Sequence, residues 1–205
     1  MALPASDDFA RDPETPLGGN WTAPDGLGDS KFFLTNFHLV GQGLSTLQWM
    51  YWNQDVFAAS HKTTATLGGT DLTSAATYAG VVTNMQATGQ SGYLFGLIAG
   101  GGYKIQRLDS GVRSNLTDCT GTPTVDDVLR LESDRTAGTL TAFVNGSQVG
   151  VVSGETTYTG GAAGLFGYNG GGAFTLDTFV ADNLSAAPPA TVTSASIQIA
   201  PVGFA

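Results

Sequence analysis

Three aromatic residues within four positions, Trp49, Tyr51 and Trp52, form the densest group of chemically informative side chains in this 205-residue chain. The polar run Asn53-Gln54-Asp55 follows directly. Aromatic rings of this kind pack against the C–H face of a sugar ring while amides and carboxylates bond its hydroxyls, so the pattern fits a largely preformed carbohydrate site. The alternative is that both tryptophans only pack in the core or at its rim, because aromatic residues dominate core burial.

Further aromatic and amide residues occur where loops could bring them to the same site. Asn169 is followed by a run of glycines, which lacks the helix and lysine of a phosphate-binding loop and is explained by turn formation. The predicted ligand-binding residues are Trp49, Tyr51, Trp52, Tyr103, Tyr168 and Asn169.

Groups suited to nucleophilic catalysis are scarce. Cys119 is the only cysteine, so an intrachain disulfide and a cysteine-rich zinc site are excluded. A catalytic thiol would need a nearby imidazole, but His38 and His61 both lie in apolar strand patterns and are interpreted as packed side chains. Aspartate predominates among the 17 acidic residues, which favours turns and oxygen-ligand cation sites over helices.

The charge balance limits the classes of partner. The net charge is −9 with only 8 basic residues, and 41% of residues are hydrophobic, so the chain has enough apolar residues for a sizeable core. Nucleic-acid and anionic-membrane binding rely on clustered lysine and arginine, and neither is expected. No basic stretch followed by an apolar run opens the chain, and no segment has the ~18 apolar residues of a membrane span. We therefore expect neither a secretory signal nor membrane insertion.

The elements that must position these residues are β-strands, and the clearest pattern runs from Val128 to Val152. Leu129, Leu131 and Ser133 alternate with charged residues, which is the period of a sheet with one solvated face. Asn145-Gly146 supplies two residues that tolerate positive φ in a type I′ hairpin turn. The segment is predicted to form three strands joined by two tight turns.

Similar short patterns recur along the chain without sustained helical spacing. The other main predicted strands are 32–40, 56–67, 78–85, 92–99, 103–108, 163–168 and 174–181. Together with 29 glycines, these strands predict an all-β, two-sheet antiparallel jelly-roll sandwich.

The sandwich domain is predicted to span residues 1–184, and residues 185–205 are predicted to form an extended tail. Pro188-Pro189 indicates a short linker, and residues 191–200 beyond it alternate in polarity without a partner strand in a hairpin of their own. Because a lone strand is unstable in water, we expect the tail to pack on a neighbouring subunit or another protein, which favours a homo-oligomer. The alternative is a frayed end.

A set of motifs occurs in a fixed order between residues 6 and 183. It opens with Ser6-Asp7-Asp8-Phe9-Ala10-Arg11 and Leu17-Gly-Gly-Asn-Trp21, and it closes with Leu176-Asp177-Thr178-Phe179. Between them lie Gly92-Tyr93-Leu94, Tyr103–Arg107 and Phe143–Gly146. In type and order these motifs resemble laminin-G-like domains of the concanavalin A-like lectin and glucanase superfamily.

The resemblance implies a jelly roll with one concave sheet, in which the first and last strands lie side by side and bring Asp8 near Asp177. Members often carry one structural ion, so Asp8 and Asp177 are the predicted ligands of a Ca²⁺ ion. The alternative is that these aspartates only cap local N–H groups.

The resemblance also implies a binding function, since members are mostly binding modules and many are minor structural proteins of bacterial viruses. We expect a non-enzymatic phage virion surface protein, a capsid decoration or tail-associated protein. It would contact other virion proteins, or its own copies, through residues 185–205, and host glycans through its aromatic residues. Weak sugar binding gains strength when many copies are displayed.

Three alternatives stay open: a stand-alone carbohydrate-binding module, a polysaccharide-degrading enzyme of the same superfamily, and a structural protein without a ligand. Glucanase members place two or three carboxylates on one strand. The three glutamates of this chain, Glu14, Glu132 and Glu155, form no Glu-x-Asp-x-x-Glu motif, so an enzyme is disfavoured.

Overall fold

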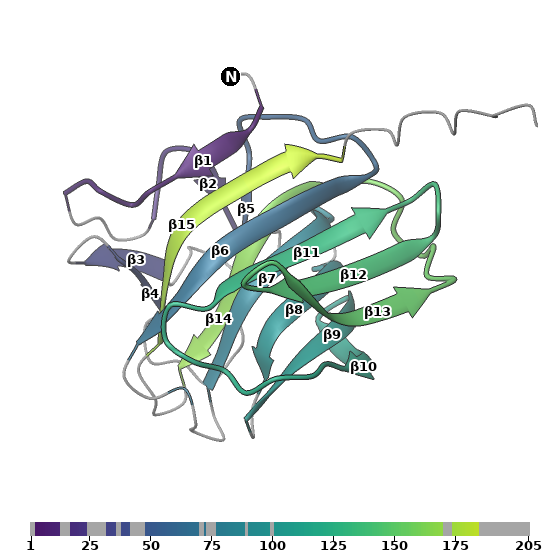
Figure 1. Ribbon diagram of the computed structural model, residues 1–205. Helices are drawn as coiled ribbons and strands as arrows, with labels where there is room; N and C mark the ends of the chain where they lie inside the picture. The colour runs from purple at the N-terminus through teal and green to yellow at the C-terminus, as the bar shows by residue number, and fades with distance from the viewer. Residues whose placement is uncertain are drawn as a thin grey trace, which may run out of the picture.

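Two antiparallel β-sheets packed face to face make up the computed structural model (Figure 1). It describes residues 3–12, 17–23, 32–35, 38–41, 48–69, 72, 77–88, 90–98, 101–169 and 174–184. These residues form fifteen strands. No helix in this part of the chain could cross a membrane. The architecture confirms the predicted two-sheet jelly-roll sandwich.

Sheet A follows the order β13 (Ser147–Ser153), β12 (Thr139–Val144), β11 (Val128–Asp134), β6 (His61–Gly69), β15 (Phe174–Asn183), β4 (His38–Gly41) and β3 (Phe32–Thr35), and β1 (Ala5–Asp7) also pairs with β15. Sheet B follows the order β10 (Val112–Asp118), β9 (Gly102–Asp109), β8 (Gly92–Ile98), β7 (Thr77–Met85), β14 (Ala162–Asn169), β5 (Gln48–Trp52) and β2 (Trp21–Thr22).

The predicted three-strand segment from Val128 to Val152 is confirmed as β11, β12 and β13. Asn145 and Gly146 have φ values of 51° and 80°, and positive values at both central positions match the expected hairpin turn. Two other predictions were wrong in their bounds. The segment 32–40 forms two paired strands, β3 and β4, and β6 begins only at His61, after a Val56 side chain that is 94% exposed.

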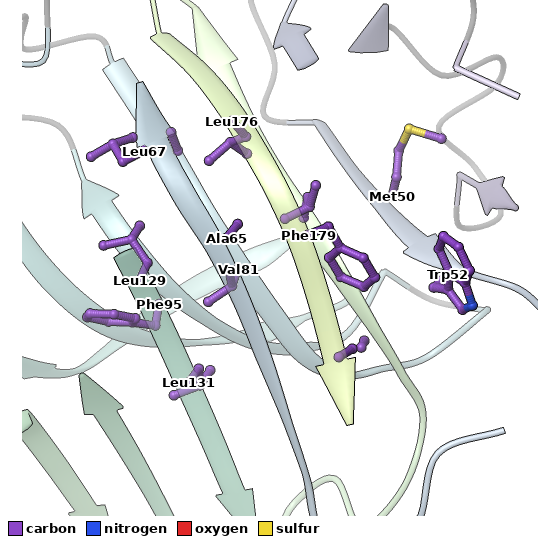
Figure 2. Close-up of a cluster of buried hydrophobic side chains, with 14 of the residues drawn as sticks. Met50, Trp52, Ala65, Leu67, Val81, Phe95, Leu129, Leu131, Leu176 and Phe179 are labelled. Carbon is purple, nitrogen blue, oxygen red and sulfur yellow. The ribbon is translucent and has the colours of Figure 1, made fainter. Parts of the chain in front are cut away.

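The core lies between the two sheets because alternate residues of each strand point inward. Leu129 and Leu131 of β11 are fully buried, while Arg130 between them faces outward. Figure 2 shows this layer, in which side chains of sheet A meet those of sheet B. Its labelled residues are Met50, Trp52, Ala65, Leu67, Val81, Phe95, Leu129, Leu131, Leu176 and Phe179.

An aromatic cluster closes the sandwich where the chain enters and leaves the domain. The ring centroids of Trp21 and Phe179 are 4.7 Å apart, and those of Trp21 and Trp52 are 5.5 Å apart. Phe9 packs on Trp21 at 6.0 Å. Asp7 accepts a 2.8 Å hydrogen bond from Trp21 Nε1, so the polar edge of the cluster is also satisfied. The cluster joins β2 and β5 of sheet B to β15 of sheet A.

His61, predicted to be a packed imidazole, is fully buried and stacks on Phe57 at 5.3 Å. Its Nδ1 lies 2.8 Å from the carbonyl oxygen of Ala58, and its Nε2 accepts a 3.2 Å hydrogen bond from the Asn84 amide. These partners require a neutral ring with the proton on Nδ1. Burial, opposed by the Ala58 hydrogen bond, lowers the pKa of His61 to about 4.

Stability is therefore expected to fall as the pH drops from about 6.5 toward 4. In this window the unfolded chain binds a proton at His61 that the folded chain does not, and the loss amounts to about 2 kcal/mol between pH 6.5 and 5. His61→Gln should be less stable at pH 7 but should lack this part of the slope. Urea unfolding of both proteins at pH 5, 6 and 7 measures it, and equal slopes would show that His61 does not titrate in this way.

Candidate functional site

Sheet B is apolar on its outer face as well as on its core face. In β5, Met50 and Trp52 point into the core between the sheets, whereas Trp49 and Tyr51 join a second cluster on the other side. The buried members of the second cluster are Trp49, Val82, Met85, Leu94, Ile98, Leu108 and Phe166. The outer face of an antiparallel sheet is normally polar. These side chains are at most 5% exposed, so the protein itself covers this apolar area.

The strand register places polar groups at one end of this face and aromatic groups at the other. One row across the sheet reads Asn115, Gln106, Leu94, Val82, Gly164 and Tyr51. The next row reads Asp118, Lys104, Gly96, Gly80, Phe166 and Trp49. In its middle a Cβ on Gly80 would lie 2.2 Å from the carbonyl oxygen of Phe95 and 2.8 Å from the Phe166 ring. The close approach of these groups requires glycine at position 80.

A pocket of about 570 Å³ lies at the polar end of this face. It is lined by Tyr78, Ile98, Lys104, Gln106, Gly111, Arg113 and Asn115. Gln106 is only 7% exposed, and its Oε1 has no hydrogen-bond partner. Trp49 Nε1, on the same face, is likewise buried without a partner. Buried polar atoms are nearly always paired, so the Gln106 amide stands out as a lining group with hydrogen-bonding capacity left over.

Other buried side-chain atoms without a partner, such as Thr83 Oγ1 and Ser133 Oγ, belong to residues that do not line this pocket. Among the described residues, Gln106 therefore both lines this pocket and has a buried side-chain atom without a partner.

Arg113 folds over the face from the edge strand. Its guanidinium carbon lies 4.5 Å from the centroid of the Tyr78 ring, although β8 and β9 separate β10 from β7 in the sheet. Arg113 is in register with Leu108 and Gly92, whereas Tyr78 precedes Ala79, which is in register with Leu97 and Tyr103 near the other end of these strands. A contact along this diagonal indicates that the sheet curves toward its outer face. Tyr78 in turn packs edge-on against Tyr168, with ring centroids 5.6 Å apart. The face is thus concave, with an aromatic and cationic wall.

The other cation of the pocket, Lys104, is paired. Its Nζ lies 2.6 Å from Oδ1 of Asp118, which also accepts a hydrogen bond from Asn115 Nδ2 at 3.1 Å. Asp118 itself is not among the lining residues, and no other carboxylate is found in the described lining of the pocket. The lining thus offers the Gln106 amide, N–H donors on Asn115, Lys104 and Arg113, and the ring of Tyr78.

The predicted ligand-binding residues divide between the two faces of sheet B. Trp49, Tyr51 and Tyr168 belong to the outer face. Trp52 and Tyr103 face the core instead, which corrects their grouping with the others. Trp52 is 2% exposed and donates a 2.8 Å hydrogen bond to Asp55, and Tyr103 is 1% exposed and donates a 2.5 Å hydrogen bond to Asp127.

Asn169 ends β14, where its backbone pairs with Thr77.

Sequence reasoning missed the residues that line the pocket. Gln106 and Arg113 lie on the two strands of one hairpin, and Tyr78 lies on a strand two places further into the sheet. The period-2 pattern of residues 103–108 already separates Lys104 and Gln106 from Tyr103, but only the register shows that they share a face with Tyr78.

The predicted metal ligands lie near the place where the chain enters the domain. β1 pairs with β15, with Asp7 opposite Phe179, so the first and last strands are adjacent as the resemblance implied. Asp8 lines a second cavity of about 860 Å³, which is bordered by β1, β15 and residues 11–12 and 18–20, and Asp177 does not line it. Asp8 accepts from the Ala10 amide and Asp177 from the Thr178 amide, which is the capping alternative.

The donor set does not fit calcium in the described part of the chain. Ca²⁺ takes six to eight oxygen ligands. No group of three or more His, Cys, Asp or Glu side chains placed to hold a metal ion occurs among the residues that the structure describes. Asp7, which lines the same cavity, already bonds Trp21 Nε1 and the Phe9 amide and pairs with Arg11.

Comparison with solved structures identifies the fold as that of the concanavalin A-like lectins and glucanases. A carbohydrate-binding module, CBM66 from Bacillus subtilis, matches with a TM-score of 0.56 and 13% identity over 80% of this chain and 92% of that one. The exoplasmic/lumenal domain of VIP36, in a form bound to Ca²⁺ and Man3GlcNAc, matches with a TM-score of 0.59 and 12% identity over 82% and 86%.

A prokaryotic β-1,3-1,4-glucanase derived from a mouse hindgut metagenome matches with a TM-score of 0.60 and 9% identity over 88% of this chain and 99% of that one. No protein-family model and no curated protein sequence matches the chain. At such low identities the likeness shows the fold alone, and the three proteins differ in their chemistry.

Millimolar Ca²⁺ is expected to leave the melting temperature of the protein unchanged relative to EDTA. An ion that binds the folded state stabilises it in proportion to the logarithm of its concentration, and the described aspartates supply no site for such an effect. Differential scanning calorimetry in both buffers measures it. A rise of several degrees that Asp8→Asn and Asp177→Asn abolish would instead establish the calcium site predicted from the sequence.

Proposed function

We propose that this protein is a non-catalytic glycan-binding domain whose site is the pocket on the concave outer face of sheet B. The observation that carries the proposal is Gln106, a buried residue that lines the pocket together with Tyr78 and whose Oε1 has no hydrogen-bond partner. Glycans offer the matching chemistry, because hydroxyl donors alternate with C–H faces that pack on aromatic rings. The volume of about 570 Å³ lies within the usual range of ligand pockets.

The positions of the carboxylates support binding over hydrolysis. A glycosidase needs two carboxyl groups that face the same sugar, one of them with a raised pKa so that it can donate a proton. Glu132 lies on the outer face of sheet A beside Arg130, on the opposite side of the sandwich from the pocket. Glu155 is buried and accepts hydrogen bonds from Tyr93 at 3.0 Å and Arg107 at 3.2 Å.

The pKa shifts of Glu155 and Asp109 also support binding over hydrolysis. Burial pushes the pKa of Glu155 upward, but hydrogen bonds from Thr157 and Tyr93 and the charge of Arg107 outweigh it and leave the pKa below its usual value. Hydrogen bonds from Tyr158 and Arg107 lower the pKa of Asp109. Both groups are ionised at neutral pH and tied into structural contacts, so neither is suited to general acid catalysis.

Replacing the unpartnered amide tests the proposal. Gln106→Leu should weaken binding of a responsive oligosaccharide at least tenfold, about 1.4 kcal/mol, because it removes the acceptor. Its stability should stay the same or rise by about 1 kcal/mol, since an unsatisfied buried oxygen is lost and apolar area is gained. Isothermal titration calorimetry against ligands chosen from a glycan array, with urea unfolding alongside, measures both.

Gln148→Leu is the matched control, because Gln148 is an exposed glutamine on β13 of the other sheet and should leave binding unchanged. Wild-type affinity in Gln106→Leu, or a wild-type protein that binds no glycan, would refute the proposal. Release of reducing sugar from a polysaccharide would favour the enzymatic alternative.

We further propose, on the sequence alone, that the domain is displayed in many copies on a phage particle and is held there by residues 185–205. This segment lies outside the described residues. The support is its alternating apolar pattern after Pro188-Pro189 and the gain in avidity that display gives to a weak sugar site.

Removal of the tail tests this second proposal. The full chain should form a defined oligomer. A version that ends at Leu184 should be a folded monomer, because it lacks the segment through which the copies would associate. Size-exclusion chromatography with light scattering measures the mass of each. If both versions have the same mass, the tail is not the assembly element, and a stand-alone carbohydrate-binding module becomes the better description.

A further inference from the structure

We infer that the pocket selects acidic glycans, those with uronic acid units, and that Arg113 binds their carboxylate. This inference rests on the proposed glycan-binding function and adds the chemical class of the ligand. It comes from the one arginine that has neither an ion pair nor a hydrogen bond among the described residues.

All five arginines of the chain lie in the part that the structure describes, and four of them are engaged. Arg11 pairs with Asp7, Arg107 with Asp109 and Glu155, and Arg130 with Glu132. Arg135 donates to the backbone carbonyls of Glu155 and Thr139. Arg113 has no carboxylate or carbonyl partner among the described residues, and its one recorded contact is the Tyr78 ring.

The stacked position of Arg113 suits it to carboxylate binding. A guanidinium that lies over an aromatic face keeps its in-plane N–H groups free, and these form two parallel hydrogen bonds to a carboxylate. The ring also limits the conformations of the side chain, so less freedom is lost when a ligand binds. Tyr78 therefore holds the guanidinium in place at the wall of the pocket.

The remaining lining groups fit the rest of an acidic sugar. Gln106 Oε1 requires a donor, which a ring hydroxyl supplies, and Asn115 and Lys104 can donate to ring oxygens. Lys104 is offset by Asp118, so the local charge of the group is positive by about the one charge of Arg113. A neutral sugar would leave that charge unanswered, whereas a uronate pairs with it.

This positive pocket belongs to a chain with a net charge of −9. The overall charge repels a polyanion at long range, but at physiological ionic strength such repulsion is screened beyond about 8 Å. Contacts within the pocket are shorter than that, so recognition of a carboxylate is compatible with the acidic surface. The test therefore uses short oligosaccharides in physiological salt.

Calorimetric titration with oligogalacturonate, oligoguluronate and oligoglucuronate, each beside its methyl ester, tests the inference. The ester keeps the ring and hydroxyls and removes only the charge. At least one acid should bind ten times or more tightly than its ester. Arg113→Gln should bring that ratio close to one, and Arg113→Lys should give an intermediate ratio, because it keeps the charge and loses the paired hydrogen bonds.

Arg130→Gln is the matched control. Arg130 also stacks on an aromatic ring, 3.9 Å from the centroid of Phe143, but on the outer face of sheet A. It should leave the acid-to-ester ratio unchanged. Equal binding of acid and ester, or an unchanged ratio in Arg113→Gln, would overturn the inference while leaving glycan binding intact. Failure to bind any acid, ester or neutral glycan would overturn both.

Discussion

Alternate residues of the strands in sheet B face either the core between the sheets or the outer face of the sheet. The packing of the core and the position of the pocket both depend on this alternation. Met50 and Trp52 complete the core against sheet A, while Trp49 and Tyr51 between and beside them belong to the outer face. A slip of one residue in the pairing of β5 would exchange these sets, so that each would have to fit the space shaped for the other. Because both faces of the sheet are apolar, polarity alone does not select the register, and the fit of particular side chains must select it.

The aromatic cluster of Phe9, Trp21, Trp52 and Phe179 holds that register in place at the edge of the sandwich. It brings together strands that are far apart in the sequence, since Trp21 and Phe179 come from opposite ends of the domain. The hydrogen bond from Trp21 Nε1 to Asp7 means that the large ring is buried without leaving its donor unpaired. The same aromatic contacts therefore close the domain and hold β5 in place.

Several parts of this fold could be predicted from the sequence because their signals are local. The meander of residues 128–152 combines a period of two with an Asn-Gly turn, and both signals act within a few residues. The strand 32–40 was predicted as one element because a continuous apolar run does not reveal that its two halves pair with each other as β3 and β4. The adjacency of β1 and β15 followed from the resemblance alone.

The site was harder to predict for a physical reason. Trp49, Tyr51 and Trp52 are neighbours in sequence, but a strand sends the third to the opposite side of the sheet from the first two. Tyr78, Gln106 and Arg113 come from three different strands. The curvature of the sheet brings them to one pocket, where Arg113 contacts the Tyr78 ring. Long-range pairing and curvature are properties of the whole sheet, which no local pattern encodes.

The buried polar groups of the protein differ in whether they have hydrogen-bond partners. Glu155 accepts hydrogen bonds from Tyr93, Arg107 and the Thr157 amide. These bonds hold the segment after β13 against sheet B. On the concave face, Gln106 Oε1 is left unmatched, which costs about 1–3 kcal/mol of stability compared with a satisfied or apolar group. A ligand hydroxyl that bonds this oxygen recovers the cost on binding. Under the proposed function, the same feature lowers the stability of the free protein and favours its complex with a ligand.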